Sequence, residues 1–307
     1  MIGRKLIERL PPDADLVLND VVEVPSRKTI VSDLSAPGAA EALVAGRPDL
    51  IFHLAAVVSG EAEADFEKGY RVNLDGTRRL FEAVRRAGGG YRPRLVFTSS
   101  IAVFGAPFPE AIGDEFLNAP LTSYGTQKAI DELLLADYTR RGFFDGVGIR
   151  LPTICVRPGK PNKAASGFFS GIIREPLNGE EALLPVPESV RHWFASPRAA
   201  VGFLLHAAEL PGERLGARRN LTMPGVCATV GGQIAALKRV AGEQAARLIR
   251  SQPDPTIMRI VSGWPQNFDA RRALELGFRA DPSFDDIIRI HIEDELQKSP
   301  PPRADRA

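Results

Sequence analysis

The sequence predicts an α/β fold in which helices cover both faces of a parallel sheet. Short apolar runs of strand length alternate, along the first half of the chain, with longer segments that have helical spacing. Each strand run is apolar throughout, which is typical of parallel strands that are buried on both faces. Strands joined in this way require right-handed crossovers. We therefore expect one twisted parallel sheet to form the centre of the molecule.

The expected elements follow from these runs in chain order. The strands of the first half are expected at 16–19, 29–31, 50–55, 94–98 and 147–151, and its longest helices at 60–87 and 123–140. Proline and glycine are dense over 152–188, which indicates loops and short elements that form the wall of a cleft. Further elements are expected as helices at 197–210, 230–241 and 284–296 and as a strand at 220–223.

These elements suggest two lobes. Residues 1–154 are expected to form the larger lobe, and residues 155–298 a smaller one with some segments that return to the first. Residues 299–307 (SPPPRADRA) are expected to be a flexible tail.

Composition excludes several classes of protein. The 307 residues include 39 Lys and Arg and 38 Asp and Glu, which gives a net charge of +1. Such a small charge does not attract the phosphate backbone of nucleic acid. The longest apolar runs, such as 50–58, are shorter than the ~20 residues that cross a bilayer. The two cysteines, Cys155 and Cys227, are too few for a disulfide scaffold. We expect a cytoplasmic protein with no membrane or nucleic-acid partner.

The sequence shows no metal-site or serine-hydrolase motif. The four histidines, His53, His192, His206 and His291, are scattered and form no H-E-x-x-H pattern. A G-x-S-x-G motif is also missing. We therefore expect no metal site.

The strongest chemical signal is the pair Tyr124 and Lys128 on an expected helix. Residues four apart share a helix face, so the phenol and the ammonium can enter one site. A nearby Lys charge favours the phenolate and lowers the tyrosine pKa from its usual value of ~10. Ser100, at the end of the preceding strand, could then hold a substrate alcohol while Tyr124 removes its proton. An ordinary surface pair of Tyr and Lys is the alternative interpretation.

Three further markers lie at the carboxyl ends of expected strands, which is the edge where open α/β sheets bind ligands. Asp20 can accept hydrogen bonds from both hydroxyls of an adenosine ribose and would repel a 2′-phosphate, which favours NAD over NADP. Asp33 and Leu34 lie where they could contact the edge of the adenine ring. After the next strand, the run Leu54, Ala55 and Ala56 has small residues, which allow the backbone to approach a dinucleotide closely. Each marker alone could be a simple turn.

Together, these residues resemble the extended short-chain dehydrogenase/reductases of the NAD-dependent epimerase/dehydratase superfamily. The matching text, beyond Asp20, Asp33 and Leu34, is HLAA at 53–56, VNLDGT at 72–77, TSSIAVFG at 98–105, YGTQK at 124–128 and RLPTICVRPG at 150–159. More narrowly, AAVVSGEAEADF at 55–66, the text at 122–135, RPGKPN at 157–162 and SGIIREPLNGE at 170–180 resemble the D-erythronate dehydrogenase group.

The resemblance implies a Rossmann-like, doubly wound parallel sheet that binds NAD, with a smaller C-terminal lobe for the substrate. It makes Ser100, Tyr124 and Lys128 the catalytic trio, with Tyr124 and Lys128 also at the cofactor and Lys128 on the nicotinamide ribose. Asn73 would support the helix that carries part of the site, and Pro152 to Ile154 would run beside the nicotinamide. Helices 60–87 and 123–140 would form the interface of a homodimer, although packing within one subunit is the competing account.

The chain departs from the family at its beginning. The family starts with a strand and a G-x-x-G-x-x-G turn, whose backbone N–H groups and helix N-terminus hold the pyrophosphate. Here only Gly3 matches, at the last glycine position. The first strand and the glycine loop are missing, and we expect a start site or a shortened chain to account for about ten absent residues.

The substrate-side residues follow from the chemistry of a sugar acid. Arginine offers two parallel donors to a carboxylate, and Arg157 and Arg174 lie in the loop-rich region. Asn162 and His192 are possible partners of substrate hydroxyls, and Ser59 could face the same cleft from the loop after HLAA. A solvated surface is the alternative for each arginine, and a turn for Ser59.

The sequence thus predicts NAD-dependent oxidation of a secondary alcohol in a small sugar acid, with D-erythronate converted to 2-oxo-tetronate. One alternative is a nucleotide-sugar epimerase or dehydratase, which uses the same trio. Another is a non-catalytic family member that has lost the phosphate loop.

Overall fold

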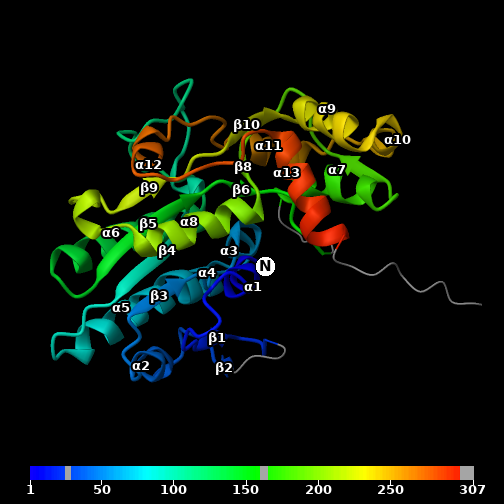
Figure 1. Cartoon of the computed structure of the whole chain (residues 1–307). Coiled ribbons are helices and arrows are strands. Elements are labelled where there is room, and N and C mark those ends of the chain that lie inside the picture. The colour runs from blue at the N-terminus through cyan, green and yellow to red at the C-terminus, as the bar shows by residue number, and fades with distance from the viewer. Residues whose placement is uncertain (25–28, 160–164, 298–307) are drawn as a thin grey trace, which may run out of the picture.

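A four-stranded parallel sheet lies at the centre of the larger lobe (Figure 1). The computed structural model describes residues 1–24, 29–159 and 165–297. The strands lie in the order β3-β4-β5-β9, and each neighbouring pair is parallel. Their bounds are β3 Leu50–His53, β4 Arg94–Ser100, β5 Asp145–Leu151 and β9 Asn220–Thr222. The expected α/β fold with a parallel sheet is confirmed.

Helices cover both faces of this sheet because its strands are apolar on both sides. On one face Val96 and Val147 pack with α8 and with the short α1. On the other face Leu95 and Phe97 pack with α2, α5 and α6. These helices are α1 Ile2–Ile7, α2 Ala39–Val44, α5 Gly76–Ala87, α6 Ser123–Arg140 and α8 Pro197–Glu209. The carboxyl ends of β3, β4 and β5 therefore open at one edge between two helical layers.

The first two strands stand apart from this sheet. β1 Leu18–Asp20 and β2 Thr29–Val31 form a separate parallel pair, in which Asp20 is level with Val31. Among the described residues, β1 pairs with β2 alone and β3 pairs with β4 alone. The expectation of a further strand and a glycine loop before Ile2 stays a prediction.

The helix expected over 60–87 is divided, so that prediction is wrong in its continuity. Its parts are α3 Ser59–Ala64, α4 Phe66–Gly69, the π-helix η1 Tyr70–Asp75 and α5. Asp65 leaves the helical conformation, with φ −131° and ψ 89°, and its side chain accepts a hydrogen bond from the Lys68 N–H at 3.0 Å. An aspartate in this position begins a new helix because it satisfies a free N–H of the first turn.

The second lobe is built on a three-stranded sheet of order β10-β8-β6. Its strands are β6 Thr153–Ile154, β8 Arg191–Ala195 and β10 Val226–Thr229, and a second pair consists of β7 Ala182–Leu184 and β11 Ile249–Ser251. Its helices are α7 Gly167–Leu177, α9 Val230–Ala241, α10 Glu243–Ala246, α11 Pro255–Ser262 and α13 Phe284–His291, whereas α12 Arg271–Glu275 packs in the core of the larger lobe. Short helical turns are η2 Ile101–Val103, η3 Gly212–Leu215 and η4 Ile292–Leu296.

This lobe differs from the expectation at two points. The region 152–188 contains an eleven-residue helix, α7, in addition to loops and short strands. The expected helix 284–296 is α-helical to His291 and continues as the π-helix η4. The strand β9 pairs with β5 of the central sheet, and α8 packs against that sheet. The lobe boundary near residue 154 stays a proposal, and the expected tail lies outside the described residues.

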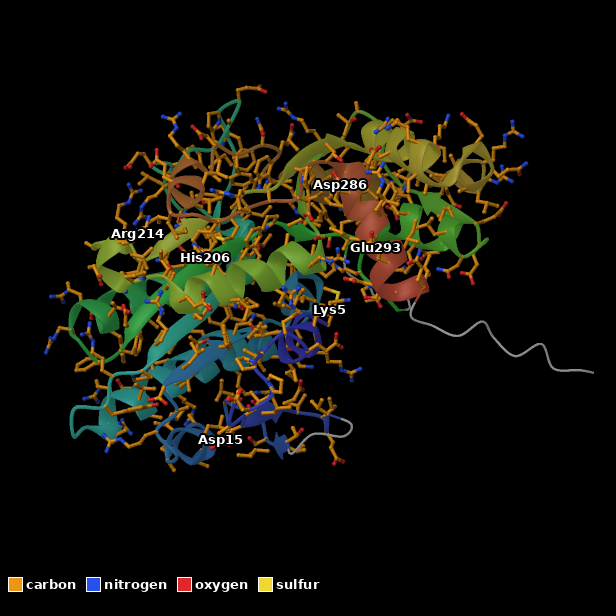
Figure 2. The ribbon with its side chains drawn as sticks, viewed as in Figure 1. Lys5, Asp15, His206, Arg214, Asp286 and Glu293 are labelled. Atoms are coloured by element: carbon orange, nitrogen blue, oxygen red, sulfur yellow. The ribbon has the colours of Figure 1, made fainter. Side chains whose placement is uncertain are left out.

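The end of the C-terminal helix is attached to the larger lobe by ion pairs. Lys5 of α1 pairs with Glu295, and Arg198 of α8 pairs with Glu293 at 2.9 Å and with Asp294 at 2.7 Å. Figure 2 labels Lys5 and Glu293 close to each other, where the first and last helices meet. These contacts connect the first helix, the last helix and α8.

Candidate active site

Ser100 and Tyr124 lie where a strand end meets a helix start. Ser100 is the last residue of β4, and its Oγ accepts a hydrogen bond from the Ala102 N–H at 3.2 Å, which begins the turn η2. Thr122 caps α6 because its Oγ1 accepts a hydrogen bond from the Gly125 N–H at 3.1 Å. Tyr124 therefore lies in the first turn of α6, and Lys128 follows one turn later.

Gly125 allows the two elements to approach each other. A Cβ atom at Gly125 would lie 2.2 Å from the carbonyl oxygen of Ala102, which is closer than real Cβ contacts. The backbone of α6 can therefore rest against η2 only with glycine here. As a result, the Ser100 hydroxyl hydrogen-bonds to the Tyr124 phenol and lowers its pKa.

The electrostatics of Tyr124 differ from the expectation. Burial raises the pKa of Tyr124 above its usual value, and the Ser100 hydroxyl and the Arg157 charge lower it without reversing this effect. The Lys128 Nζ lies 6.0 Å from the centroid of the Tyr124 ring. The expected lowering of the Tyr124 pKa is therefore not seen in this structure, because removal of the phenol from water outweighs the nearby charges.

Lys128 is almost completely buried. Only 1% of its surface is exposed, and its Nζ lies 4.6 Å from the centroid of the Phe97 ring. Burial lowers the pKa of Lys128 to about 8, while Asp131 and Glu132 act in the opposite direction. Among the described residues, no carboxylate forms an ion pair with Lys128 within 4 Å. The site thus holds a buried cation beside a phenol and a hydroxyl.

The residues expected at the adenosine half lie at the carboxyl ends of β1, β2 and β3. Asp20 ends β1 with an exposed carboxylate, whose Oδ1 accepts a hydrogen bond from the Val22 N–H at 3.3 Å. Asp33 accepts hydrogen bonds from the Ser35 N–H and hydroxyl, which lower its pKa. Leu34 is buried in the core, whereas Ala55 is exposed.

The neighbours of these residues are also placed. Leu54 is half-buried against the core on the α8 face, and Ala56 is half-buried after β3. Gly3 lies in the first turn of α1, with open space where a Cβ would be.

Asn73 contacts the protein on all sides instead of opening to a ligand. Its Oδ1 accepts a hydrogen bond from the Val57 N–H at 2.8 Å, and its Nδ2 donates to the Val57 carbonyl at 3.1 Å and to the Gln127 Oε1 at 2.7 Å. Asn73 therefore ties the loop after β3 to α6. Pro152 and Ile154 follow β5 and are buried.

Arg157 is one of the expected substrate residues, and its positive charge lowers the pKa of Tyr124. Its Nε donates to the Ile154 carbonyl at 3.1 Å and its Nη2 to the Ser166 Oγ at 3.2 Å, while burial lowers its pKa. No carboxylate of the described residues forms an ion pair with it. Arg174, in contrast, is paired with Glu175 at 2.5 Å and donates to the Arg157 carbonyl at 2.7 Å, so it holds the Arg157 backbone.

His192 has no free ring nitrogen. Its Nδ1 donates to the Pro265 carbonyl at 2.8 Å, so its Nε2 accepts a hydrogen bond from the Thr153 hydroxyl at 2.7 Å. Burial lowers the pKa of His192 to about 4, which keeps the ring neutral. Ser59 begins α3 and is partly exposed. Asn162 lies outside the described residues.

Sequence reasoning missed two buried carboxylates on α6. Glu132 forms a two-point ion pair with Arg150, at 2.8 and 2.7 Å, and accepts hydrogen bonds from the Ser99 hydroxyl at 2.6 Å and from Asn118 at 2.9 Å. Asp131 is completely buried. Consecutive acids on a helix are typical of a solvated face, so only their spacing of three and four residues from Lys128 could have indicated a role.

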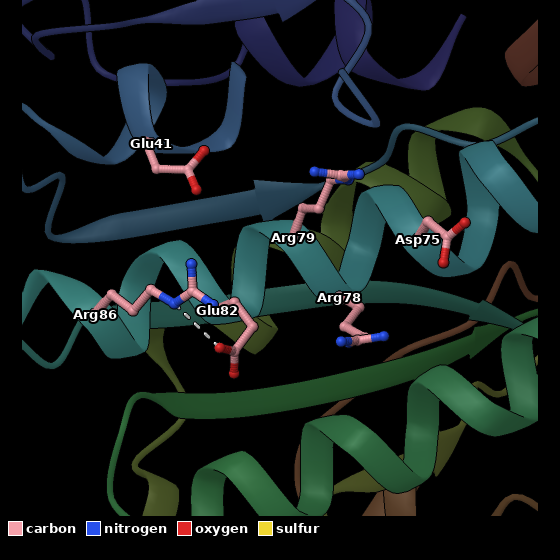
Figure 3. A pocket seen from close by; sticks show the side chains of 6 residues that line it. All are labelled: Glu41, Asp75, Arg78, Arg79, Glu82 and Arg86. Atoms are coloured by element: carbon pink, nitrogen blue, oxygen red, sulfur yellow. Dashed lines mark ion pairs between the residues drawn. The ribbon is translucent and has the colours of Figure 1, made fainter. Parts of the chain in front are cut away.

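A charged groove lies away from this site, between α2 and α5 (Figure 3). It has a volume of about 270 Å³ and contains none of the expected site residues. Its lining side chains carry three positive and three negative charges, from Glu41, Asp75, Arg78, Arg79, Glu82 and Arg86.

Comparison with known proteins identifies the family. Residues 1–209 match a family model described as the NAD dependent epimerase/dehydratase family. The chain belongs to this family. Within the part that the structure describes, no helix has the length and apolar character to span a membrane, and no three metal-binding side chains form a cluster.

Several members of the family are closely similar to this chain. A D-erythronate dehydrogenase from Cupriavidus necator is 51% identical over 87% of this chain and 82% of its own length. A D-erythronate dehydrogenase from Haemophilus influenzae is 43% identical over 91% of this chain and 90% of its own. A solved structure described as a nucleoside-diphosphate-sugar epimerase from Agrobacterium tumefaciens is 63% identical, with a TM-score of 0.92 over 97% of this chain and 92% of that one.

The family implies NAD(H), and the described residues fit the adenosine part of this cofactor. Asp20 presents an exposed carboxylate at a strand end, and only one of its oxygens takes part in the contact with Val22. Ala55, two residues after β3, is also exposed. Carboxylate oxygens are the acceptors that ribose hydroxyls need.

Proposed function

We propose that this chain oxidises a secondary alcohol of a small sugar acid with NAD, converting D-erythronate to 2-oxo-tetronate. The observation that carries the proposal is that the charge of Arg157 acts on Tyr124, which hydrogen-bonds to Ser100 and lies one turn before the buried Lys128. Among the described residues, Arg157 has no carboxylate partner. Similarity to two D-erythronate dehydrogenases, at 51% and 43% identity, supports the same substrate.

Each residue has a distinct part in this proposal. The Arg157 guanidinium binds the substrate carboxylate, with its backbone held by Arg174. The Ser100 hydroxyl orients the substrate alcohol, and Tyr124 accepts its proton as general base. The Lys128 charge stabilises the phenolate that does so. A bound nicotinamide supplies the hydride acceptor.

We propose that the cofactor is NAD in preference to NADP. An exposed carboxylate at Asp20 binds a ribose with two free hydroxyls and repels a 2′-phosphate. Gly3 would lie at the pyrophosphate, and Asp33, Leu34, Leu54, Ala55 and Ala56 would surround the adenosine half. The nicotinamide half would be surrounded or supported by Asn73, Tyr124, Lys128, Pro152 and Ile154. Ser59 and Asn162 remain further substrate candidates, whereas both ring nitrogens of His192 are already bonded to Pro265 and Thr153.

The test is a screen of four-carbon sugar acids with NAD, followed by the absorbance of the NADH that forms. Tyr124→Phe should reduce turnover at least about 100-fold, since general-base catalysis contributes about that much or more. NAD affinity, measured by calorimetry, should change little. Tyr138→Phe is the matched control, because Tyr138 lies on the same helix but bonds to Glu82. Full turnover by the Tyr124→Phe variant would remove Tyr124 from its role.

A nucleotide-sugar epimerase is the second candidate, favoured by the 63% identical structure that is described as one. An epimerase would convert a nucleotide sugar without net formation of NADH, whereas the dehydrogenase accumulates NADH with the free acid. A chain that binds no NAD in calorimetry would fit a non-catalytic member of the family.

We also propose a cytoplasmic homodimer. The cysteines Cys155 and Cys227 are both unpaired, which suits a reducing compartment. Two large apolar side chains on neighbouring helices are exposed, Phe66 of α4 by 57% and Leu133 of α6 by 72%. A second copy would cover them.

A further inference from the structure

Asp131 is a buried carboxylate without a hydrogen-bond donor. It lies on α6, three residues after Lys128, and none of its surface is exposed. Neither carboxylate oxygen has a hydrogen-bond partner of good geometry. Burial of an ionised carboxylate is costly unless an opposite charge compensates it. The surroundings of Asp131 must therefore supply that charge or a proton.

A hydroxyl that acts on Asp131, on Thr77 of α5, donates its proton to another acceptor. The Thr77 Oγ1 donates to the Asn73 carbonyl at 2.5 Å and contacts the His53 Nε2 at 2.8 Å. Since a hydroxyl carries one proton, the His53 ring must donate in that contact. His53 is held neutral, because burial lowers its pKa to about 3. The Thr77 hydroxyl still lowers the pKa of Asp131, but neither Thr77 nor the neutral His53 ring supplies the positive charge that an ionised Asp131 requires.

The charged groups around Asp131 leave Lys128 as its counterion. Glu132 is negative and already paired with Arg150, whose Nη2 lies 2.7 Å from a Glu132 oxygen. Tyr124 carries no positive charge in either protonation state, and the negative charge of Asp131 raises the pKa of Tyr124. Lys128, in turn, has no carboxylate within 4 Å among the described residues. Asp131 and Lys128 are therefore two buried titratable groups, and the charged form of each is favoured by the charge of the other.

We propose that Asp131 is a positioning residue that keeps Lys128 in its cationic form beside Tyr124. This inference rests on the proposed function, since it concerns the same Tyr124 and Lys128 pair. Burial lowers the Lys128 pKa and raises the Asp131 pKa, and the charge of each residue counteracts that effect on the other. Without Asp131, Lys128 would lose its proton closer to neutral pH, and the Tyr124 phenolate would lose its supporting charge.

The first test is the pH profile of kcat/KM for alcohol oxidation. Asp131→Asn keeps the size of the side chain but removes its charge, so the alkaline decline of activity should begin about one pH unit lower than in the unchanged protein. Asp131→Glu should restore the original profile in part. Asp137→Asn is the control, because Asp137 lies on the same helix but is exposed and paired with Arg140. Identical profiles for the Asp131→Asn and Asp137→Asn variants would overturn the proposal.

A second test does not depend on activity and therefore separates this inference from the proposed function. In a Lys128→Met background, Asp131 has lost its counterion, so adding Asp131→Asn should raise the thermal midpoint at pH 8. In the unchanged background the same substitution should lower it. A residue that only fills space would shift both midpoints in the same direction. If the Asp131→Asn protein does not fold alone, the double variant must still be more stable than the Lys128→Met protein, and the reverse order would contradict the proposal.

Discussion

At the scale of single residues, our proposal assigns recognition of the acid group of the substrate to Arg157. The side chain of Arg157 is partly buried, and its charge lowers the pKa of Tyr124. It donates hydrogen bonds to two neutral partners, the Ile154 carbonyl and the Ser166 hydroxyl. Arg174 is not equivalent, because Glu175 neutralises it. A substrate carboxylate would thus meet one unneutralised guanidinium.

We predict that Arg157→Gln raises the KM for the sugar acid about 10- to 100-fold, since a hydrogen bond to a charged group contributes about 1.5–3 kcal/mol. NAD affinity should stay nearly constant, as calorimetry would show. Arg157→Lys should recover only part of the affinity, because lysine lacks the planar fork. Arg140→Gln, at an exposed arginine paired with Asp137, serves as control. An unchanged KM in the Arg157→Gln variant would exclude Arg157 from carboxylate binding.

The sequence predicted those site residues whose position follows from a strand end or a helix turn. Ser100 ends β4, and Tyr124 and Lys128 are one turn apart on α6. It could not predict Asp131 or Glu132 as buried, since the pattern of two acids on a helix is the same for a solvated face. Nor could it show that His192 uses both ring nitrogens, because Pro265 and Thr153 come from distant segments.

At the scale of elements, the contact between α6 and η2 sets the distance between Tyr124 and Ser100. We predict that Gly125→Ala pushes the start of α6 away from Ala102, with turnover reduced at least tenfold and stability lower by about 1–3 kcal/mol. Gly202→Ala, on α8, is the matched control, because a Cβ there meets nothing within 4 Å. That variant should be slightly more stable, by about 0.5–1 kcal/mol. Turnover and urea unfolding measure both effects, and full activity of the Gly125→Ala variant would disprove this role of Gly125.

The elements that the sequence predicted poorly are those whose ends depend on local capping. The apolar spacing over 60–87 continues across Asp65, but the capping bond from the Lys68 N–H divides the helix there. The region 152–188 is rich in glycine and proline, which indicated loops, but it contains the helix α7. Pro176 lies within this helix, near its end. The helix expected at 123–140 and the strand at 29–31 have the predicted bounds, since Thr122 caps the former and a continuous apolar run forms the latter.

At the scale of the whole molecule, three buried histidines link stability to pH. Burial lowers the pKa of His53 to about 3, and those of His192 and His291 to about 4. Because the folded values lie below the usual 6.5, the unfolded chain binds more protons in this window. The stability that the neutral rings provide is therefore complete above a pH of about 6.5 and is lost as the pH falls toward about 4.

We predict that the free energy of unfolding declines below a pH of about 6.5 by up to about 1.4 kcal/mol per pH unit for each of these histidines. Urea unfolding at about pH 7.5, 6.0 and 5.0 measures the slope. His291→Leu should reduce the slope by the contribution of one histidine. This substitution removes no hydrogen bond, because neither ring nitrogen of His291 has a partner among the described residues. A stability that rises as the pH falls through this range would contradict the prediction.

The outer face of α6 is the surface that a second copy would cover in the proposed dimer. The inner face of this helix holds Lys128, Asp131 and Glu132, and its outer face exposes Leu133 by 72%. Burial of such a leucine in an interface is worth about 1.5–3 kcal/mol, whereas a charge there must be removed from water. The same helix would thus carry both the site and the interface.

We predict that Leu133→Glu shifts the chain from dimer to monomer in sedimentation velocity at micromolar concentration. Each interface would contain the change twice if the two copies are related by a twofold axis, so the effect on dissociation is doubled. Leu274→Glu, on α12, is the matched control, because Leu274 is also exposed, by 45%, but lies on a different element. If the unchanged chain sediments as a monomer at every concentration, or if both variants dissociate equally, α6 does not form the interface.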